Sequence, residues 1–201
     1  MRAILLPALR ATLATWVLCG LAYPLTVTGL GEWLLPVQAN GSLIRNANGT
    51  ILGSRLIGQS WSGPEWFHGR PSATTAPYNA AASGGSNLGP TNRALAARLA
   101  ADRKAAELEQ SELMGGKLPA DMLTTSGSGL DPDISPAYAA LQISRIAAAR
   151  GLSSARIAGL VAKNTTGRAL GIFGEARVNV LELNLDLEAM IRSPLEGLRQ
   201  Q

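Results

Sequence analysis

The sequence has very few of the residues from which most enzyme active sites and metal centres are built. Its 201 residues include one cysteine, Cys19, and one histidine, His68. A single cysteine can form neither a disulfide within the chain nor a cysteine cluster around zinc or iron–sulfur groups. The cysteine count therefore leaves the redox compartment open, and the sequence predicts no metal site.

Charged and aromatic residues are also scarce. Charged residues make up 16% of the chain, against about 25% in an average soluble protein. The formal net charge is +4, and removing residues 1–36 takes away Arg2, Arg10 and Glu32 and leaves +3. Binding of nucleic acid needs cations clustered on one face, whereas the basic residues here are scattered among acidic ones. We expect no nucleic-acid partner.

The apolar residues are concentrated near the N-terminus. No charged residue occurs from Ala11 to Gly31, and about 20 such residues are enough for a helix to cross a bilayer. Pro24 is tolerated in a membrane helix and predicts a kink. A cleaved signal peptide is the alternative, because residues 37–39 resemble a cleavage site, but signal cores run only about 7–15 residues. We therefore expect a retained anchor in residues 1–36.

The basic residues predict how this anchor is oriented. Arg2 and Arg10 precede the apolar stretch, and the next basic residue is Arg45. Basic residues flanking a membrane helix favour the cytoplasmic side. We expect a single-pass protein in contact with membrane lipid, with a cytoplasmic N-terminus and a periplasmic or extracellular domain.

Residues 37–191 are predicted to form one small mixed α+β domain, with residues 192–201 as a tail. Asn48-Gly49 lies between two apolar stretches within residues 42–58, which is typical of a β-hairpin with a type I′ turn. Trp61, Trp66 and Phe67 follow, and we expect them to cap a core.

Helices and a final strand are predicted from cap residues and apolar spacing. Thr91, Ser135 and Ser153 are candidate N-caps, and Gly151 is a candidate helix stop. Leucines that alternate with polar residues predict a half-buried strand at 178–187. The helices are expected at residues 92–113, at 136–150, and from 153 to an end near 164.

Two stretches rich in serine, glycine and asparagine, residues 73–90 and 123–134, are predicted as long loops. Loops longer than about 12–15 residues are usually functional or disordered. Plain turn chemistry explains this composition, and so does a backbone-rich surface that docks on a partner or an anion. Asp131 and Asp133 could hold a cation, but Asp-Pro-Asp before Ser-Pro is more simply a turn.

No catalytic motif is matched, so we expect no catalytic residue. Gly84 and Gly89 have P-loop spacing, but Pro90 stands where the lysine must be. A serine triad would depend on His68, and Ser128 lacks the strand–turn–helix setting of a nucleophile elbow. The alternatives are an anchored extracytoplasmic hydrolase that uses Ser128, Asp131 or His68, and a solute-binding module in the long loops.

Several motifs resemble the KdpC family, the small subunit of the bacterial Kdp potassium-transporting ATPase. Together with the N-terminal anchor they span almost the whole chain, which departs from the family pattern at Asp133 and in residues 192–201. The motifs are residues 53–59, 67–72, 78–80, 87–92, 125–132, 134–136 and 178–184.

The resemblance implies a non-catalytic accessory subunit of an ATP-driven, high-affinity potassium uptake complex in the bacterial inner membrane. Its partners would be a potassium-channel-like subunit, a P-type ATPase subunit and a small single-span subunit. It would stabilise the assembly and act as a catalytic chaperone that raises the ATP affinity of the ATPase subunit.

The resemblance also implies site residues. Nucleotide contacts are expected in the second loop and on the helix after it, at Gln142, Ser126, Gly127, Ser128 and Gly129. An extracytoplasmic domain cannot reach cytoplasmic ATP, so a stabilising or ion-entry role on the outer face is the competing expectation. Partner contacts are expected at Arg70 and in the first loop, at Ser83, Gly84, Gly85, Ser86, Asn87 and Leu88.

Overall fold

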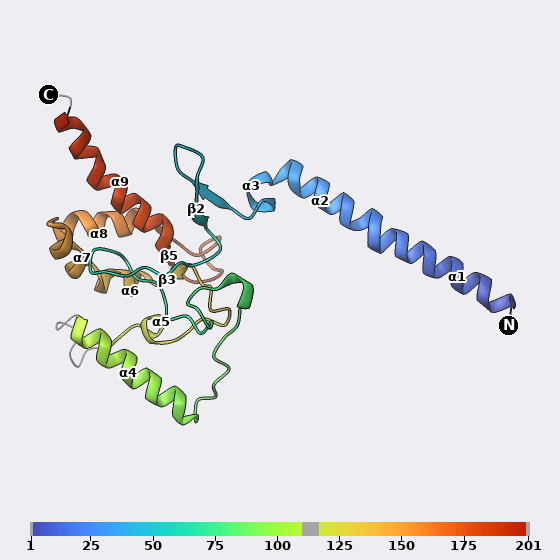
Figure 1. Cartoon of the computed structure of the whole chain (residues 1–201), viewed down its shortest axis with the longest axis horizontal. Coiled ribbons are helices and arrows are strands. Elements are labelled where there is room, and N and C mark those ends of the chain that lie inside the picture. Colours follow the sequence, from blue (N-terminus) through green and yellow to red (C-terminus); the bar gives the residue numbers. More distant parts are fainter. Residues whose placement is uncertain (1, 110–116, 200–201) are drawn as a thin grey trace. The chain divides into compact units, whose positions relative to one another are not determined.

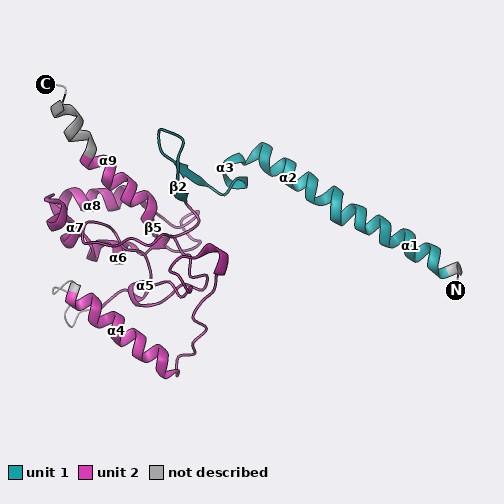
Figure 2. Cartoon of the chain, in the orientation of Figure 1, with its two compact units in different colours: residues 1–54 teal, residues 55–201 magenta. Residues whose placement is uncertain are grey.

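The computed structural model describes residues 2–109 and 117–199 of the chain, with side chains at residues 4–108 and 117–191 (Figure 1). It divides into two compact units, Met1–Ser54 and Arg55–Gln201 (Figure 2). The predicted anchor and hairpin belong to unit 1. The long loops and the C-terminal helices belong to unit 2.

Unit 1 begins with one long apolar helix built from α1 (Arg2–Val17), the π-helical turn η1 (Leu18–Ala22) and α2 (Tyr23–Leu34). Within Ile4–Leu34, the most apolar 18-residue stretch has a mean hydropathy of 1.7 and buries no residue within the structure. The helix is therefore long and apolar enough to cross a membrane, a property that N-terminal signal sequences share. It is the only such helix in the described part of the chain.

The backbone of this helix is distorted next to Pro24, where the sequence predicts a kink. The Tyr23 N–H donates to the carbonyl of Leu18, five residues back, which is the hydrogen bond of a π turn. Pro24 has no N–H to donate, and its ring crowds the carbonyl four residues earlier. The wider turn just before the proline accommodates both effects.

The predicted hairpin is present, but its turn is of another type. β1 (Leu43–Arg45) and β2 (Ile51–Ser54) pair antiparallel, and α3 (Pro36–Ala39) precedes them. Of Asn48 and Gly49 only Gly49 has a positive φ, at 80°, whereas a type I′ turn needs both. The Gly49 N–H donates to the Asn46 carbonyl, and the Asn46 side chain accepts from the backbone of Asn48 and Thr50. The Asn46 side chain therefore organises this turn.

Unit 2 is an α+β domain, as the sequence predicts. In Figure 1 the helices α6 to α9 gather beside the small sheet, and α4 lies against the short α5. The sheet is antiparallel, in the order β3 (Asp133–Ile134), β5 (Arg177–Asn179), β4 (Thr165–Thr166). The helices are η2 (Ala80–Ala82), α4 (Arg93–Glu109), α5 (Ala120–Leu123), α6 (Pro136–Leu141), α7 (Ile143–Arg150), α8 (Ser154–Lys163) and α9 (Val180–Arg199).

The helix caps are largely as predicted. Ser135 and Ser153 cap α6 and α8, and Gly151 ends α7 with a φ of 63°. The N-terminus of α4 differs, because the Asn92 side chain, rather than that of Thr91, accepts from Ala94. The predicted end of this helix near Leu113 lies outside the described residues.

The strand predicted at 178–187 is wrong beyond Asn179, because α9 begins at Val180. The Asn179 side chain accepts from the Glu182 N–H and so caps the helix. The buried residues at 180, 183, 184 and 187 follow the spacing of one helix face. One of these buried residues is the polar Asn184. Because an asparagine occupies a core position, the leucines alternate with polar residues in the sequence, which is the pattern of a strand.

Two buried amide side chains hold the loop segment Phe67–His68 in the core, where the Phe67 ring is fully buried. Asn184 accepts from the Phe67 N–H at 2.9 Å and donates to the Phe67 carbonyl at 3.0 Å. Gln142 accepts from the His68 N–H at 2.7 Å and donates to the His68 carbonyl at 3.1 Å. Each amide pairs with the backbone as a neighbouring strand would, so buried polar groups are satisfied. We call this arrangement the amide clamp.

The amide clamp also corrects a helix prediction. The single helix expected at residues 136–150 is two helices, α6 and α7, separated at Gln142. Gln142 is only 1% exposed, and its side chain reaches the loop at the point where the helix is interrupted. Arg145 adds a further hydrogen bond to the Gln142 side-chain oxygen at 2.8 Å.

We expect Asn184→Ala to lower the free energy of unfolding by about 2–4 kcal/mol, because the Phe67 N–H and carbonyl would lose their partners while remaining buried. The measurement is urea unfolding of the full chain in detergent. Ser154→Ala, at an exposed position on α8, is the control and should change the value by less than about 0.5 kcal/mol. Equal stabilities for the two variants would contradict the role given to the clamp.

Candidate functional site

The two serine- and glycine-rich loops, predicted separately, lie against each other in unit 2. The Ser83 hydroxyl and the Gly84 N–H both donate to the Ser128 carbonyl, at 3.0 Å and 2.8 Å. We call residues 83–89 and 125–130 the paired loops. The loop residues expected to contact nucleotide and most of those expected to contact partners therefore belong to one pair of loops, whereas Gln142 lies outside it.

Glycines are needed where the paired loops meet. A Cβ on Gly85 would lie 3.0 Å from the Gly127 carbonyl oxygen. Gly129 has a φ of 69°, and a Cβ there would lie 2.8 Å from the Gly84 carbonyl oxygen. The contact at Gly129 is too close for a side chain and that at Gly85 is tighter than ordinary packing, so the loops approach backbone to backbone.

Two hydroxyl side chains that the sequence did not single out support the paired loops. The Ser72 hydroxyl donates to the Gly129 carbonyl at 2.7 Å and accepts from the Tyr78 N–H at 3.1 Å. The Thr74 hydroxyl donates to the Ala76 carbonyl at 2.6 Å. In the sequence these residues resemble every other polar loop residue, so only the fold identifies them.

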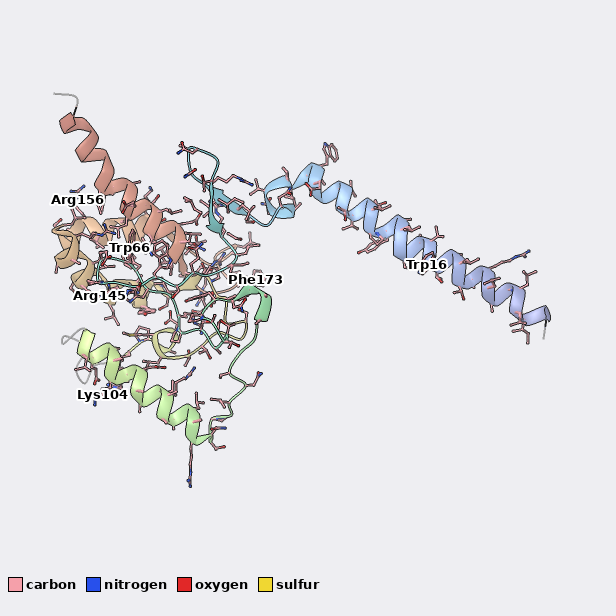
Figure 3. All side chains as sticks on the ribbon, viewed as in Figure 1. Trp16, Trp66, Lys104, Arg145, Arg156 and Phe173 are labelled. Atoms are coloured by element: carbon pink, nitrogen blue, oxygen red, sulfur yellow. The ribbon has the colours of Figure 1, made fainter. Side chains whose placement is uncertain are left out.

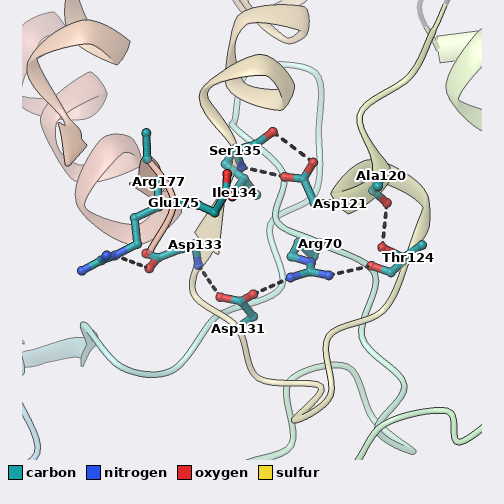
Figure 4. Close-up of a pocket in the computed structure, with 11 residues that line it drawn as sticks. Arg70, Ala120, Asp121, Thr124, Asp131, Asp133, Ile134, Ser135, Glu175 and Arg177 are labelled. Atoms are coloured by element: carbon teal, nitrogen blue, oxygen red, sulfur yellow. Dashed lines mark hydrogen bonds and ion pairs between the residues drawn. The ribbon is translucent and has the colours of Figure 1, made fainter. Parts of the chain in front are cut away.

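Arg70, predicted as a partner contact, ties the first loop region to the end of the second. Its guanidinium donates to the Asp131 carboxylate at 2.7 Å, and both side chains are about three-quarters buried (Figure 4). The other oxygen of Asp131 accepts from the Asp133 N–H at 3.1 Å. Arg70 is therefore held in an ion pair. Its side chain fixes the position of Asp131, which directly follows the second of the paired loops.

A cavity of about 450 Å³ opens beside this ion pair. Figure 4 shows the Arg70–Asp131 pair, a second pair between Arg177 and Asp133 at 3.0 Å, and Asp121, which accepts from the Ser135 backbone and hydroxyl. Burial raises the pKa of Asp133, while Arg177 and Asn179 act in the opposite direction.

The partners of the two aspartates favour the turn interpretation of Asp131-Pro-Asp133. Each carboxylate has its own guanidinium, so neither is left to hold a cation. Within the described residues, no three histidine, cysteine or acidic side chains are placed to hold a metal ion.

The remaining predicted nucleotide residues differ in exposure. Gly127 and Ser128 are exposed, whereas Ser126 is buried. Gln142 lies in the amide clamp, where its side-chain oxygen accepts from both His68 and Arg145. Direct contact between Gln142 and a nucleotide would therefore require the clamp to open.

In the first loop, Asn87 is exposed and has a φ of 51°, while Ser86 and Leu88 are half-buried.

The residues proposed for a hydrolase belong to separate hydrogen-bond groups. The His68 ring hydrogen-bonds the Gly63 carbonyl at 2.8 Å, and Ser128 accepts from the Leu130 N–H. The structure thus brings together the predicted docking residues and gives the triad interpretation no support.

Tyr78 joins these parts and has a shifted pKa. Its hydroxyl donates to the Arg70 carbonyl at 2.6 Å, and its ring packs against Gly58, where a Cβ would overlap it. Burial and the nearby Asp131 carboxylate raise the pKa of Tyr78 to about 12, although Arg70 acts in the opposite direction.

Comparison with known proteins gives a consistent result. The family model described as "KdpC: K+-transporting ATPase, c chain" matches residues 5–189. A protein of Methylobacterium nodulans is 54% identical over 92% of this chain and 96% of its own length. One of Gemmatimonas aurantiaca is 52% identical over 92% of each chain, and one of Caulobacter vibrioides is 52% identical over 91% of each. All three bear the name "Potassium-transporting ATPase KdpC subunit".

We expect Tyr78→Phe to lower the free energy of unfolding by about 1 kcal/mol at pH 7, because the hydrogen bond to Arg70 is lost. The folded state holds the phenol proton more tightly than the unfolded state, with a pKa of about 12 against 10.0. The contribution of Tyr78 to stability is therefore complete below pH 10 and is lost as pH rises towards 12.

Urea unfolding between pH 9 and 11.5 would check this prediction. Wild type should lose more stability over the alkaline range than Tyr78→Phe, since the other tyrosines are common to both proteins. Parallel pH profiles would show that Tyr78 ionises equally in the folded and unfolded states.

Proposed function

Because the chain belongs to the KdpC family, the c chain of the K+-transporting ATPase, we propose that it stabilises an ATP-driven potassium uptake complex from the outer face of the membrane. It is an accessory subunit and not the catalytic one. The match to the family over residues 5–189 is the observation that carries the proposal, because it includes both the apolar helix and unit 2.

The proposed partners are a potassium-channel-like subunit, a P-type ATPase subunit and a small single-span subunit. Exposure of the apolar helix supports this, since large side chains such as Trp16 and Leu25 are 67% and 70% exposed. Such a surface is stable only in contact with lipid or with other membrane helices. The inner membrane is the proposed location.

The paired loops are the proposed docking surface for these partners. They present peptide groups and small side chains, and their conformation is fixed by the contacts of Ser72, Ser83 and Gly84. A surface that is already ordered loses little conformational entropy on binding. Its exposed positions include Asn87, Gly127 and Ser128.

A nucleotide-binding role at Gln142, with the subunit as a catalytic chaperone, is the second proposal that the family resemblance supplies. The proposed location of unit 2 opposes it, because ATP is cytoplasmic. The buried, fully engaged oxygen of Gln142 also opposes it. The side of the membrane on which unit 2 lies therefore decides between the two roles.

Co-purification tests the assembly proposal and its docking surface. Gly127 and Gly159 both have open space where a Cβ would be; the first belongs to the paired loops and the second to α8. We expect the wild-type chain and Gly159→Arg to co-purify with the larger transporter chains in mild detergent. Gly127→Arg should retain about tenfold less of them, since a long cation would occupy the docking surface.

The controls separate two ways to fail. A wild-type chain that elutes alone as a monomer would overturn the assembly proposal. Wild type and Gly127→Arg that assemble equally well would overturn only the docking surface.

Thiol labelling tests the orientation. In a Cys19→Ser background, Lys104→Cys places a single thiol on an exposed position of α4 (Figure 3). We expect a membrane-impermeant maleimide to label it in intact spheroplasts, because the positive charge near the N-terminus favours an outer domain. Labelling only after permeabilisation would place unit 2 in the cytoplasm and favour the nucleotide role.

Intact mass measurement tests whether the anchor is retained. We expect residues 1–36 to be present in the mature protein, whereas a chain beginning at Asn40 would contradict the anchor.

A further inference from the structure

The segment between β4 and β5 exposes three large apolar side chains in a row. Leu170 is 89% exposed, Ile172 is 73% exposed and Phe173 is 65% exposed, and Figure 3 labels Phe173. We call residues 169–173 the apolar turn. Adjacent apolar side chains left in water usually mark a contact surface. Neither the family match nor the paired loops account for this one.

The apolar turn has a fixed conformation. Ala169 and Phe173 exchange two backbone hydrogen bonds of 2.8 Å and 2.9 Å, and the Ile172 N–H donates to the Ala169 carbonyl at 3.2 Å. Gly171 has a φ of 74°, and Leu170 has a φ of 53°, which is disfavoured for a leucine. Residues held in disfavoured backbone conformations cluster at functional sites, so this turn is a candidate contact.

Charge around the apolar turn indicates a protein partner. Arg168 and Glu175 flank the turn, with their charged groups 3.8 Å apart and largely exposed. Segments that insert into anionic lipid carry an excess of basic residues, whereas this flank is neutral. A neutral rim around rigid apolar side chains matches the anatomy of a protein interface, with an apolar centre and a polar edge.

The chain that follows the apolar turn lies near the end of the second of the paired loops. Glu175, Ala176 and Arg177, which follow it, line the same cavity as Asp131 and Asp133 at the end of the second loop (Figure 4). Residues just after the apolar turn therefore share this cavity with residues just after the second of the paired loops. One large partner could contact both.

We propose that the apolar turn docks into an apolar pocket on another chain of the potassium-transport complex, with polar groups of that chain facing Arg168 and Glu175. This inference rests on the proposed function, because it requires the other chains. Ile172 and Phe173 provide the buried contact area, and the fixed conformations of Leu170 and Gly171 provide its shape.

The first test is co-purification of the full chain with the tagged channel-like and ATPase subunits. Phe173→Asp and Ile172→Asp should each retain at least about tenfold less of these subunits, since a carboxylate would enter an apolar pocket. Leu108→Asp is the matched control, because Leu108 is 79% exposed on α4. The isolated variants should melt at the wild-type temperature, since the substituted side chains are exposed.

The outcomes distinguish the two proposals. If the wild-type chain is not retained, the proposed function fails. If wild type, Leu108→Asp and the two turn variants are all retained equally, only the apolar turn proposal is overturned. Variants that are lost from the complex and also melt at lower temperature would show a folding defect and overturn the docking role.

An environment-sensitive fluorophore tests the kind of partner. In a Cys19→Ser background, Ile172→Cys carries an NBD label, and the full chain is reconstituted in vesicles of phosphatidylethanolamine and phosphatidylglycerol. We expect a blue shift only when the other transporter subunits are present. A blue shift in vesicles that contain this chain alone would identify lipid or a second copy as the occupant, and would overturn the proposal.

Discussion

The amide clamp is the constraint on which the rest of unit 2 depends. Buried peptide groups must be hydrogen-bonded, and the segment at Phe67 and His68 has no neighbouring strand to provide the partners. Gln142 and Asn184 provide them from two different helices. With the segment fixed, the Phe67 ring fills the core and Arg70, three residues later, reaches Asp131. Hydrogen bonds formed in the core thus help to position Asp131, the residue that follows the second of the paired loops.

The sequence predicted those elements whose signals are local. The caps at Ser135 and Ser153, the stop at Gly151 and the hairpin depend on residues a few positions apart. The contact between the paired loops joins Gly84 to Ser128, and the amide clamp joins Phe67 to Asn184. These residues are far apart in the chain, so no repeating pattern in the sequence predicts their contacts. The error at 180–187 has the same origin, because a core position occupied by asparagine hides the apolar face of α9.

The candidate site shows the same division. Composition left both loops open between plain turns and a docking surface, and the family resemblance added Gln142 and Arg70 as expected contacts. The structure then shows which of these residues a ligand or partner can reach. Gly127 and Ser128 are exposed, whereas Gln142 is hydrogen-bonded to His68 and Arg70 is paired with Asp131. Residue type cannot make this distinction, because an amide that supports a buried loop and an amide that binds a ligand look alike in a sequence. The exposed turn at 169–173 was missed because three apolar residues between glycines resemble part of a core.

The apolar helix is considerably longer than a bilayer requires. Thirty-one residues from Ile4 to Leu34 rise about 46 Å, whereas the hydrocarbon core is about 30 Å thick. Such hydrophobic mismatch is relieved by tilting, by local thickening of the lipid, or by shielding of the surplus turns against a neighbouring protein. Since the uncharged stretch from Ala11 to Gly31 alone matches the bilayer, the surplus lies mainly on the side of Arg10. In the proposed anchor, these surplus turns would be available for contact with neighbouring chains at the membrane boundary, far along the chain from the loops of unit 2.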